Sequence, residues 1–537
     1  MRAHALFGCL AFSAFLHCAP ETPIAPAVRY PTQDDRPRDG GTLVRRLDGD
    51  VRTLNPVLAY GTERYVAQYL FTPLIYLDRD QRPIPGAAQR WFVRDGGRVY
   101  RFVLDARARY ADGAPVRARD VEFTLQKIVE AASRAQMAES FLYLDRTRTR
   151  VVDDRTIDVA FTRPLSTQLT RFAEVYVVPA HVYEHGNFQE DFNARAVGSG
   201  PYTLRTYEPG RQIVVERRAD YWGDKPHIQT VIFRVIQDHE TAWNALKLGD
   251  IDETFLRADT WRRAAQDRAL TAHIRFERFP GHTYSYIAWN NRRPLFADPR
   301  VRRALSMCIP VDTVVQTLYS GTARRITGPF RDGDAARNPA IAPVAYNPVE
   351  GARILADAGW TDRDADGVLD DNHGTPFAFA LEIFPNDRAF AELAQAELRR
   401  VGIAVELRII DAAIPRIREG NFDAAYLGVD LDSDPDLFGT FHSSQKPPHG
   451  GNIVSYANPD VDRLIDEART EFDVARRQHL HRQLHALLAA DQPYTWIVQP
   501  DAKWALRRRV RGVQNSPGRG LFLWYPGEFD WWLTDAP

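Results

Sequence analysis

Short strand-like segments alternate with helical segments along almost the whole chain, and this alternation limits the folds that the chain can adopt. Segments such as LIYLD, VYRFVL and FAFALEIF have the apolar and aromatic residues typical of strands, whereas VEFTLQKIV and FAELAQAELRRVG carry apolar residues at helical spacing. Turn residues at Asp80–Gln81 and Asp95–Gly97 separate the early strands and indicate hairpins. A length of 537 residues suffices for two or three domains. We therefore predict an α/β protein with more than one lobe.

Composition excludes several classes of protein. The 69 Lys and Arg residues nearly balance the 70 Asp and Glu residues, so no basic excess points to nucleic acid as a partner. Cys308 is the only cysteine after residue 18, which rules out a disulfide framework and suggests a buried structural thiol. The chain has no nucleophile elbow, HExxH, phosphate-binding loop or CxxC motif. In Gly198–Pro201 the proline lacks an amide donor, so we expect a turn into a strand. No enzymatic activity is expected.

The N-terminus has the pattern of an export signal. The apolar run Ala5–Leu16 is too short to span a bilayer but suits the core of a signal peptide. Cys18 follows, and then a stretch rich in proline and polar residues, which resembles a bacterial lipoprotein signal with a lipid on Cys18. The alternative is simple secretion with cleavage near Ala19 or beyond. We expect a signal peptide over 1–18 and a flexible tether over 19–40.

Two further clusters could hold a metal ion. The segment DRDADGVLDD places carboxylates and a glycine at positions 1, 3, 5, 6 and 9 of a calcium loop, although His373 stands where a bidentate carboxylate is usual. The candidate calcium ligands are Asp362, Asp364, Asp366 and Asp370. The alternative is a polar turn; in both cases the feature is structural. His481 and His485 are spaced to share a metal on one helical face, but no third ligand lies nearby, so we expect a solvated helix face. His442 beside Ser443 specifies no catalytic geometry.

Several motifs occur in the order found in one protein family. The segments GGTLVRRLDGDVRTLNPVLA, VYRFVLDARARYADGAPVRARDVEFTLQKI, VGSGPYTLRTYEPGRQIVVERRADYWG, YIAWNNRRPLFADPRVRRALS and YANPDVDRLIDEARTEF resemble the family 5 extracellular solute-binding proteins. These are the peptide- and nickel-binding subunits of ABC importers. The resemblance covers about Gly41 to Trp532.

This resemblance implies the two-lobed periplasmic-binding-protein fold (type II, peptide-binding class), with an extra subdomain on the first lobe and a hinge of two crossing strands. Mapped onto this chain, lobe 1 takes 41–72, 196–278 and 508–537, the extra subdomain takes 73–195, and lobe 2 takes 279–507. The hinge is expected near Gly281–Asn290 and Ala505–Gly512. The family also implies a monomer that requires no cofactor and docks on the transmembrane subunits of an ABC permease.

The acidic stretch GVDLDSDPDLFGTFHSS is the main candidate for the ligand site. In peptide-binding relatives an aspartate after this strand pairs with the α-amino group of the peptide. Counting forward from Asp423 places that aspartate at Asp432, whereas counting back from Pro435 places it at Leu431. Strand alternation puts Gly428, Asp430 and Asp432 on one face, so we favour Asp432, with Asp430 second. The predicted ligand contacts are Asp432, Asp430, Gly428, Val429, Asn55 and Asn290.

Alternatives remain at several of these positions. The acidic stretch could be a solvated loop, and Asp434 and Asp436 are expected to face water around Pro435. Val429 replaces the tryptophan of the peptide binders, which removes one aromatic wall. Asn290 could equally hydrogen-bond the hinge backbone.

The function that follows is an exported binding protein, periplasmic or in the cell envelope and anchored through Cys18. It would close its two lobes on a small solute, first of all a short peptide, and deliver it to a membrane permease. The alternatives are a non-peptide solute (a sugar, an amine metabolite or a metal chelate) or a ligand sensor. A metal-assisted hydrolase ranks last.

Overall fold

The computed structural model describes residues 36–534 except 131–134, 410–413, 432–434 and 518. Arg38–Pro537 form one unit, and the description below concerns that unit. The signal segment 1–18 and Cys18 lie outside the described residues.

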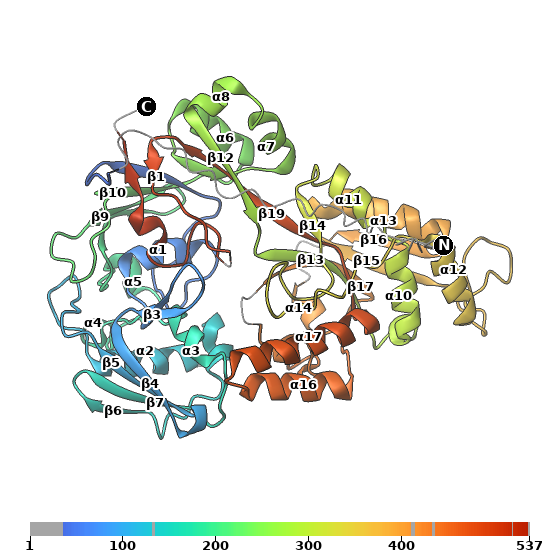
Figure 1. Cartoon of the computed structure of the whole chain (residues 1–537), viewed down its shortest axis with the longest axis horizontal. Helices are drawn as coiled ribbons and strands as arrows, with labels where there is room; N and C mark the ends of the chain where they lie inside the picture. Colours follow the sequence, from blue (N-terminus) through green and yellow to red (C-terminus); the bar gives the residue numbers. More distant parts are fainter. Residues whose placement is uncertain (1–35, 131–134, 410–413, 432–434, 518, 535–537) are drawn as a thin grey trace, which may run out of the picture. The chain divides into compact units, whose positions relative to one another are not determined.

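The largest sheet has the strand order β12-β19-β11-β1-β10-β9-β8 and forms the first lobe, and β14 of the second lobe joins it through β19 (Figure 1). Its strands are β1 Thr42–Leu47, β8 Tyr202–Glu208, β9 Gln212–Arg217, β10 Thr230–Val235, β11 Glu253–Phe255, β12 Ile274–Pro280, β14 Ala323–Arg325 and β19 Val498–Arg507. Alternate residues such as Val231 and Phe233 are buried, as the period of a strand requires. The accompanying helices are α1 Thr62–Leu70, α6 His239–Leu248, α7 Ala258–Ala264 and α8 Arg268–His273.

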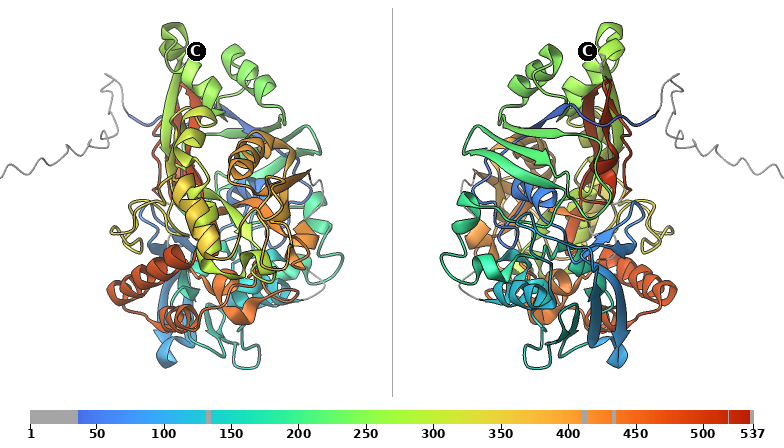
Figure 2. Two further views of the ribbon diagram at one scale, coloured as in Figure 1. Left: turned by 90° about the vertical axis from the view of Figure 1, so that its right-hand side faces the viewer. Right: turned by 90° about the vertical axis from the view of Figure 1, so that its left-hand side faces the viewer.

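The second lobe is built on a five-stranded sheet with the order β16-β15-β17-β13-β18. Its strands are β13 Thr283–Trp289, β15 Ala378–Ile383, β16 Ala404–Ile409, β17 Ala424–Asp430 and β18 Tyr494–Trp496. The helices of this lobe are α9 Pro294–Ala297, α10 Pro299–Met307, α11 Val311–Thr317, α12 Pro348–Asp357, α13 Arg388–Arg400, α14 Ile414–Arg418, α15 Phe438–Phe441, α16 Pro459–Thr470 and α17 Val474–Asp491. Figure 2 shows α16 and α17, in orange-red, packed side by side. Cys308 is buried, and burial raises the pKa of its thiol to about 12, so it is an inert core group.

The extra subdomain contains a four-stranded antiparallel sheet with the order β4-β5-β7-β6. Its strands and its main helix are β4 Ala88–Arg94, β5 Val99–Leu104, β6 Arg150–Asp153, β7 Thr156–Ala160 and α2 Ala118–Val129. Shorter elements complete it, namely β2 Ile75–Leu77, β3 Pro83–Pro85, α3 Gln168–Arg171, α4 Ala180–Tyr183, α5 Asp191–Ala194 and the 3-10 turn η3 Gln136–Phe141. Tyr100, Phe102 and Ile157 share one core with Leu43 and Phe233 of the first lobe, so subdomain and lobe fold around common apolar side chains.

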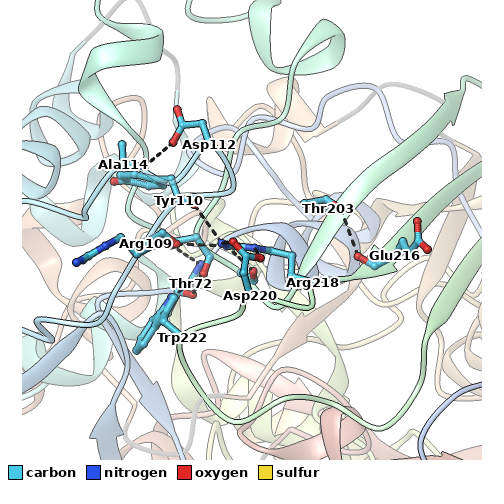
Figure 3. A network of polar contacts seen from close by, with 12 residues as sticks. Thr72, Arg109, Tyr110, Asp112, Ala114, Thr203, Glu216, Arg218, Asp220 and Trp222 are labelled. Atoms are coloured by element: carbon cyan, nitrogen blue, oxygen red, sulfur yellow. Dashed lines mark hydrogen bonds and ion pairs between the residues drawn. The ribbon is translucent and has the colours of Figure 1, made fainter.

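A buried arginine fastens the subdomain to the first lobe (Figure 3). Arg218 is 4% exposed and donates to the carbonyls of Arg109, Tyr110 and Gly200 at 3.1–3.3 Å, while Asp220 balances its charge at 3.1 Å. Gly200 itself lies so close to the end of α1 that a Cβ there would sit 2.5 Å from backbone atoms of Tyr69 and Leu70. The segment Gly198–Pro201 is therefore a close-packed turn into β8, as expected.

Two chain segments connect the sheets of the lobes. The first is the short link Gly281–His282 between β12 and β13. The second is β19, which pairs with β14 up to Pro500 and with β12 from Asp501 onward. The first crossing lies at the start of the expected range Gly281–Asn290. The second lies earlier than the expected Ala505–Gly512, because Asp501–Arg507 already pair within the first-lobe sheet.

The histidines of α17 correct the expectation of a solvated helix face. His481 and His485 are 3% and 0% exposed. Nδ1 of His485 accepts a hydrogen bond from the Asn338 backbone N–H at 3.0 Å, so Nε2 carries the proton and donates to Thr327 Oγ1 at 3.0 Å. Burial lowers the pKa of His485 to about 4. Its ring is therefore a satisfied core group with no lone pair left for a metal.

A buried ionic cluster ties three parts of the first lobe together. Arg45 of β1 contacts Glu253 of β11 at 3.1 Å and Glu528 of the C-terminal turn at 3.2 Å, and all three are at most 4% exposed. Gln68 of α1 also donates to Glu528 at 2.7 Å. Burial and the neighbouring charge of Glu253 raise the pKa of Glu528 to about 7, although Arg45 opposes this shift.

This cluster gives a pH-dependent prediction. A carboxyl group whose pKa rises from 4.5 to about 7 on folding stabilises the protein fully below pH 4.5, and this contribution is lost as pH rises toward 7. Relative to the wild type, Glu528→Gln should therefore gain about 1 to 3 kcal/mol between pH 4.5 and 8. Thermal unfolding across this pH range measures the effect. Glu467→Gln on the exposed face of α16 is the control, and an equal pH profile for both variants would contradict the prediction.

Candidate functional site

The C-terminal end of β17 has one edge without a strand partner. Gly428, Val429 and Asp430 pair with β13, whereas β15 pairs only with Ala424 and Ala425 further back in β17. Among the described residues no strand lies on the other edge of Gly428–Asp430. Such an edge offers backbone N–H and C=O groups to an extended ligand.

The side chains at this end of β17 differ sharply in exposure. The Asp430 side chain is 74% exposed, and one carboxylate oxygen lies 3.9 Å from His282 Nε2. Val429 is 41% exposed, whereas Leu431 is 5% exposed and packs in the lobe 2 core. Leu431 therefore faces the core and offers nothing to a ligand. Asp432 lies outside the described residues, and its role stays a prediction.

Asp436 does not face water, contrary to expectation. It forms an ion pair with Arg469 at 3.0 Å, and the two side chains are 19% and 11% exposed. The Arg469 guanidinium also stacks 3.9 Å from the centre of the Phe438 ring. An arginine of α16, more than thirty positions later in the chain, thus reduces the charge repulsion among the carboxylates of this stretch.

The end of α16 also joins lobe 2 to the extra subdomain. The Ser166 N–H donates to the Arg469 carbonyl at 2.7 Å, and Ser166 Oγ donates to the Ala468 carbonyl at 3.1 Å. The Arg469 guanidinium lies 5.6 Å from the Tyr143 ring of the subdomain. Lobe 2 and the subdomain are therefore in direct contact at the end of α16.

Asn55, a predicted ligand contact, is 0% exposed. Its Nδ2 donates to the Phe188 carbonyl at 2.6 Å, and its Oδ1 accepts from the Val57 N–H at 3.0 Å. The side chain thus holds the loop that follows it. That loop lines a cavity of about 160 Å³, which sequence reasoning missed because its walls come from distant segments. The lining residues are Pro56, Val57, Ala59, Tyr60, Arg64, Met137, Ser140, Glu174 and Tyr176.

Asn290 is likewise buried, at 1% exposure. Its Nδ2 donates to the carbonyls of Gly420 and Phe422 at 3.1 and 2.7 Å, and its Oδ1 accepts from the Arg292 N–H at 3.2 Å. These bonds fix the turn that leads into β17 and do not involve the hinge backbone. For both asparagines a ligand role stays a prediction, and it would require breaking these bonds.

The candidate calcium loop brings some of its predicted ligands together. Carboxylate oxygens of Asp362, Asp364 and Asp370 all lie within 4.8 Å of one another. Asp366 is not part of this group, and its carboxylate accepts from the Val368 N–H at 2.7 Å. Asp362 also accepts from the Gly367 N–H at 3.1 Å, so the same carboxylates stabilise the turn. These carboxylate oxygens suit a hard cation such as calcium, and they equally serve as hydrogen-bond acceptors for a polar turn.

Among the described residues no helix combines the length and apolar character that crossing a membrane demands.

Comparison with known proteins identifies the family. The oligopeptide-binding protein AppA of Bacillus subtilis (strain 168) is 25% identical over 528 residues, which cover 93% of each sequence. The dipeptide-binding protein of Escherichia coli (strain K12) is 24% identical over 507 residues, covering 89% of this chain and 92% of its own length.

Solved structures show the same fold. The structure of AppA in complex with a nonapeptide matches with a TM-score of 0.79 at 25% identity, covering 93% of this chain and 100% of AppA. The structure of NikA from Brucella suis in complex with Fe(III)-EDTA matches with a TM-score of 0.78 at 24% identity, covering 88% of this chain and 97% of the NikA chain. The expected two-lobed α/β fold is thereby confirmed.

Residues 82–449 match the family model of bacterial extracellular solute-binding proteins, family 5 (middle). Because this match spans more than half of the 537 residues, the chain belongs to the family 5 extracellular solute-binding proteins, which bind solutes and are not enzymes.

Proposed function

We propose that this protein binds a short peptide between its two lobes and delivers it to an ABC permease in the membrane. The observation that carries the proposal is the unpaired edge of β17 over Gly428–Asp430, which ends in an exposed carboxylate. The edge can pair with an extended backbone, and the Asp430 carboxylate can accept hydrogen bonds from the ligand's α-amino group. The names of the relatives AppA and the dipeptide-binding protein support a peptide ligand.

Closure of the two lobes couples ligand binding to transport. A ligand that contacts both lobes binds the closed form more tightly, so it shifts the equilibrium toward closure. The contacts of Ser166 with Ala468 and Arg469 are the described polar bonds that closure forms between lobe 2 and the subdomain. The closed form then docks on the permease, and the protein acts as a monomer.

The ligand class distinguishes this proposal from its main alternative. NikA, of similar fold, was solved with a metal chelate, and Val429 leaves the β17 end without an aromatic wall. Mass spectrometry of the molecules that co-purify with the protein separates the two ligands. Peptides support the proposal, and a metal chelate, sugar or amine metabolite would replace it.

We also propose that the chain is exported and anchored through a lipid on Cys18. The apolar run before Cys18 and the polar stretch after it support this. Mass spectrometry of the mature N-terminus decides between a lipidated Cys18 and simple cleavage near Ala19.

Asp430 gives the first prediction of this proposal. Asp430→Asn removes a charge-assisted hydrogen bond to a ligand amine, so it should weaken a peptide with a free N-terminus about 10-fold or more. The same peptide with an acetylated N-terminus should bind wild type and variant equally. Calorimetric titration provides the measurement. The control Asp259→Asn alters an exposed aspartate of α7, and equal effects of the two variants would rule out Asp430 as the anchor.

Arg469 gives the second prediction. Arg469→Met leaves Asp436 unpaired in a half-buried position and removes the contact with Tyr143, so the closed form should lose stability relative to the open form. Peptide affinity should fall roughly 3- to 30-fold. Small-angle scattering should show less compaction on adding peptide. The control is Arg463→Met, an exposed ion-paired arginine on the same helix. Unchanged affinity and compaction in the Arg469 variant would contradict the closing role.

Calcium gives the third prediction. If the loop holds a structural ion, about 1 mM Ca²⁺ should raise the thermal unfolding midpoint, and a chelator should reverse the rise. Asp364→Asn should abolish the response, because Asp364 is one of the three convergent carboxylates. Asp259→Asn should leave the response intact. A midpoint that does not respond to calcium identifies the loop as a polar turn.

A further inference from the structure

The four-stranded sheet of the subdomain has one face in the core and one face toward solvent. Tyr100 and Phe102 of β5 point into the core that the subdomain shares with the first lobe. The residues on either side of them point the other way, because side chains alternate along a strand. The strand register aligns one such residue from each strand in a row across the outer face, namely Phe92 of β4, Arg101 of β5, Asp158 of β7 and Arg150 of β6.

The aspartate of this row is neutralised by its neighbours. Nε and Nη2 of Arg101 donate to the two carboxylate oxygens of Asp158 at 2.6 and 2.7 Å, and Nε of Arg150 lies 3.7 Å from Oδ2. The hydrogen bonds from Arg101 lower the pKa of Asp158, so its carboxyl group stays ionised and paired. Asp158 is 5% exposed, whereas the Arg150 side chain is 72% exposed, so the row presents positive charge to solvent.

Two further arginines add to the charge of this face. Arg90 and Arg94 lie two positions before and after Phe92 in β4 and therefore share its face. Both are exposed, and neither forms an ion pair with a described residue. Asp153, which lies opposite Thr156, is the second acid on the face. Four arginines thus stand against two aspartates, which leaves two positive charges in excess.

The acids at the two ends of the sheet do not cancel this excess, because they have cations of their own. Asp95, in the turn between β4 and β5, pairs with Arg148 at 2.9 Å. Asp154, in the turn between β6 and β7, pairs with Arg117. We call the outer face of β4–β7, with Arg90, Arg94, Arg101 and Arg150, the arginine face.

Apolar groups lie among these arginines. Phe92 is 46% exposed, and Val99 and Val103 of β5 are half-buried on the same face. Guanidinium groups around an exposed aromatic ring match the headgroup region of an anionic membrane, where phosphates accept paired hydrogen bonds and apolar side chains enter the interface. The whole chain carries a formal charge of −1, so the attraction to an anionic surface comes from this face and not from the net charge.

We propose that the arginine face lies against a membrane that contains anionic phospholipids. The guanidinium groups of Arg90, Arg94 and Arg150 bind headgroup phosphates, and Phe92 enters the interface. A planar partner suits this face, because paired strands hold the charges in one layer. The proposal goes beyond solute binding and does not depend on which ligand the protein carries.

The test measures co-sedimentation with vesicles. The chain from Ala19 onward is used, because a lipid on Cys18 would itself hold the protein on a membrane. Vesicles of equal parts phosphatidylcholine and phosphatidylglycerol should bind it about 10-fold or more tightly than vesicles of phosphatidylcholine alone. Raising the salt concentration from about 0.1 to about 0.5 M should release the protein, because the charges are exposed and screened.

Three variants tie the binding to the arginine face. The double variant Arg90→Gln with Arg94→Gln should lower affinity for the anionic vesicles roughly 10- to 30-fold. Arg262→Gln with Arg268→Gln is the matched control, since it removes two exposed arginines of α7 and α8 that form no ion pair with a described residue. Phe92→Ser keeps every charge and should weaken binding without changing its salt dependence.

The outcomes are decisive in both directions. A loss confined to the Arg90 and Arg94 double variant supports the arginine face. Equal losses in both double variants show that net charge alone drives the binding and overturn the proposal. Equal binding to vesicles with and without phosphatidylglycerol also overturns it, and so does the absence of vesicle binding in a protein that instead captures an acidic protein through these arginines.

Discussion

Strand β19 hydrogen-bonds to strands of both lobes, and the relation between the lobes depends on it. Up to Pro500 it pairs with β14, and from Asp501 it pairs with β12 and β11. Asp501 marks the change of partner, with Arg324 of β14 at 3.5 Å and Arg278 of β12 at 3.6 Å. Paired strands resist bending, so we expect any motion of the lobes at this change of partner and at Gly281–His282.

Ion pairs neutralise some of the charged side chains near the proposed ligand site. Arg469 neutralises Asp436, and Arg52 neutralises Glu63. Asp430 remains exposed at the end of β17, whereas Arg64 is paired with Glu174. Neighbouring ion pairs decide which charges remain for a ligand, because an isolated half-buried charge is costly.

Much of the fold could be predicted from local patterns. The segment VYRFVL forms β5, the helix expected after Pro115 forms α2, and FAELAQAELRRVG forms α13 with its terminal turn. Local periodicity predicts such elements because their hydrogen bonds and buried faces lie within a few residues. The surroundings of individual side chains could be predicted less well from the sequence. We expect His481 and His485 in water, but both lie in the core. The Phe330 ring lies near both of them, and Thr327 and Asn338 hydrogen-bond to His485 from a distant loop.

The sequence by itself determined the family, the α/β class and the presence of a dense acidic stretch after a strand. These follow from residue order and short-range periodicity, which survive without knowledge of the packing. Only the tertiary structure decided that Leu431 faces the core, that Asn55 and Asn290 hold backbone turns, and that Arg64 and Glu174 meet in a cavity. The physical reason is the same in each case. Exposure and ion pairing depend on residues far apart in the chain, and their meeting is set by how the sheets and the subdomain pack.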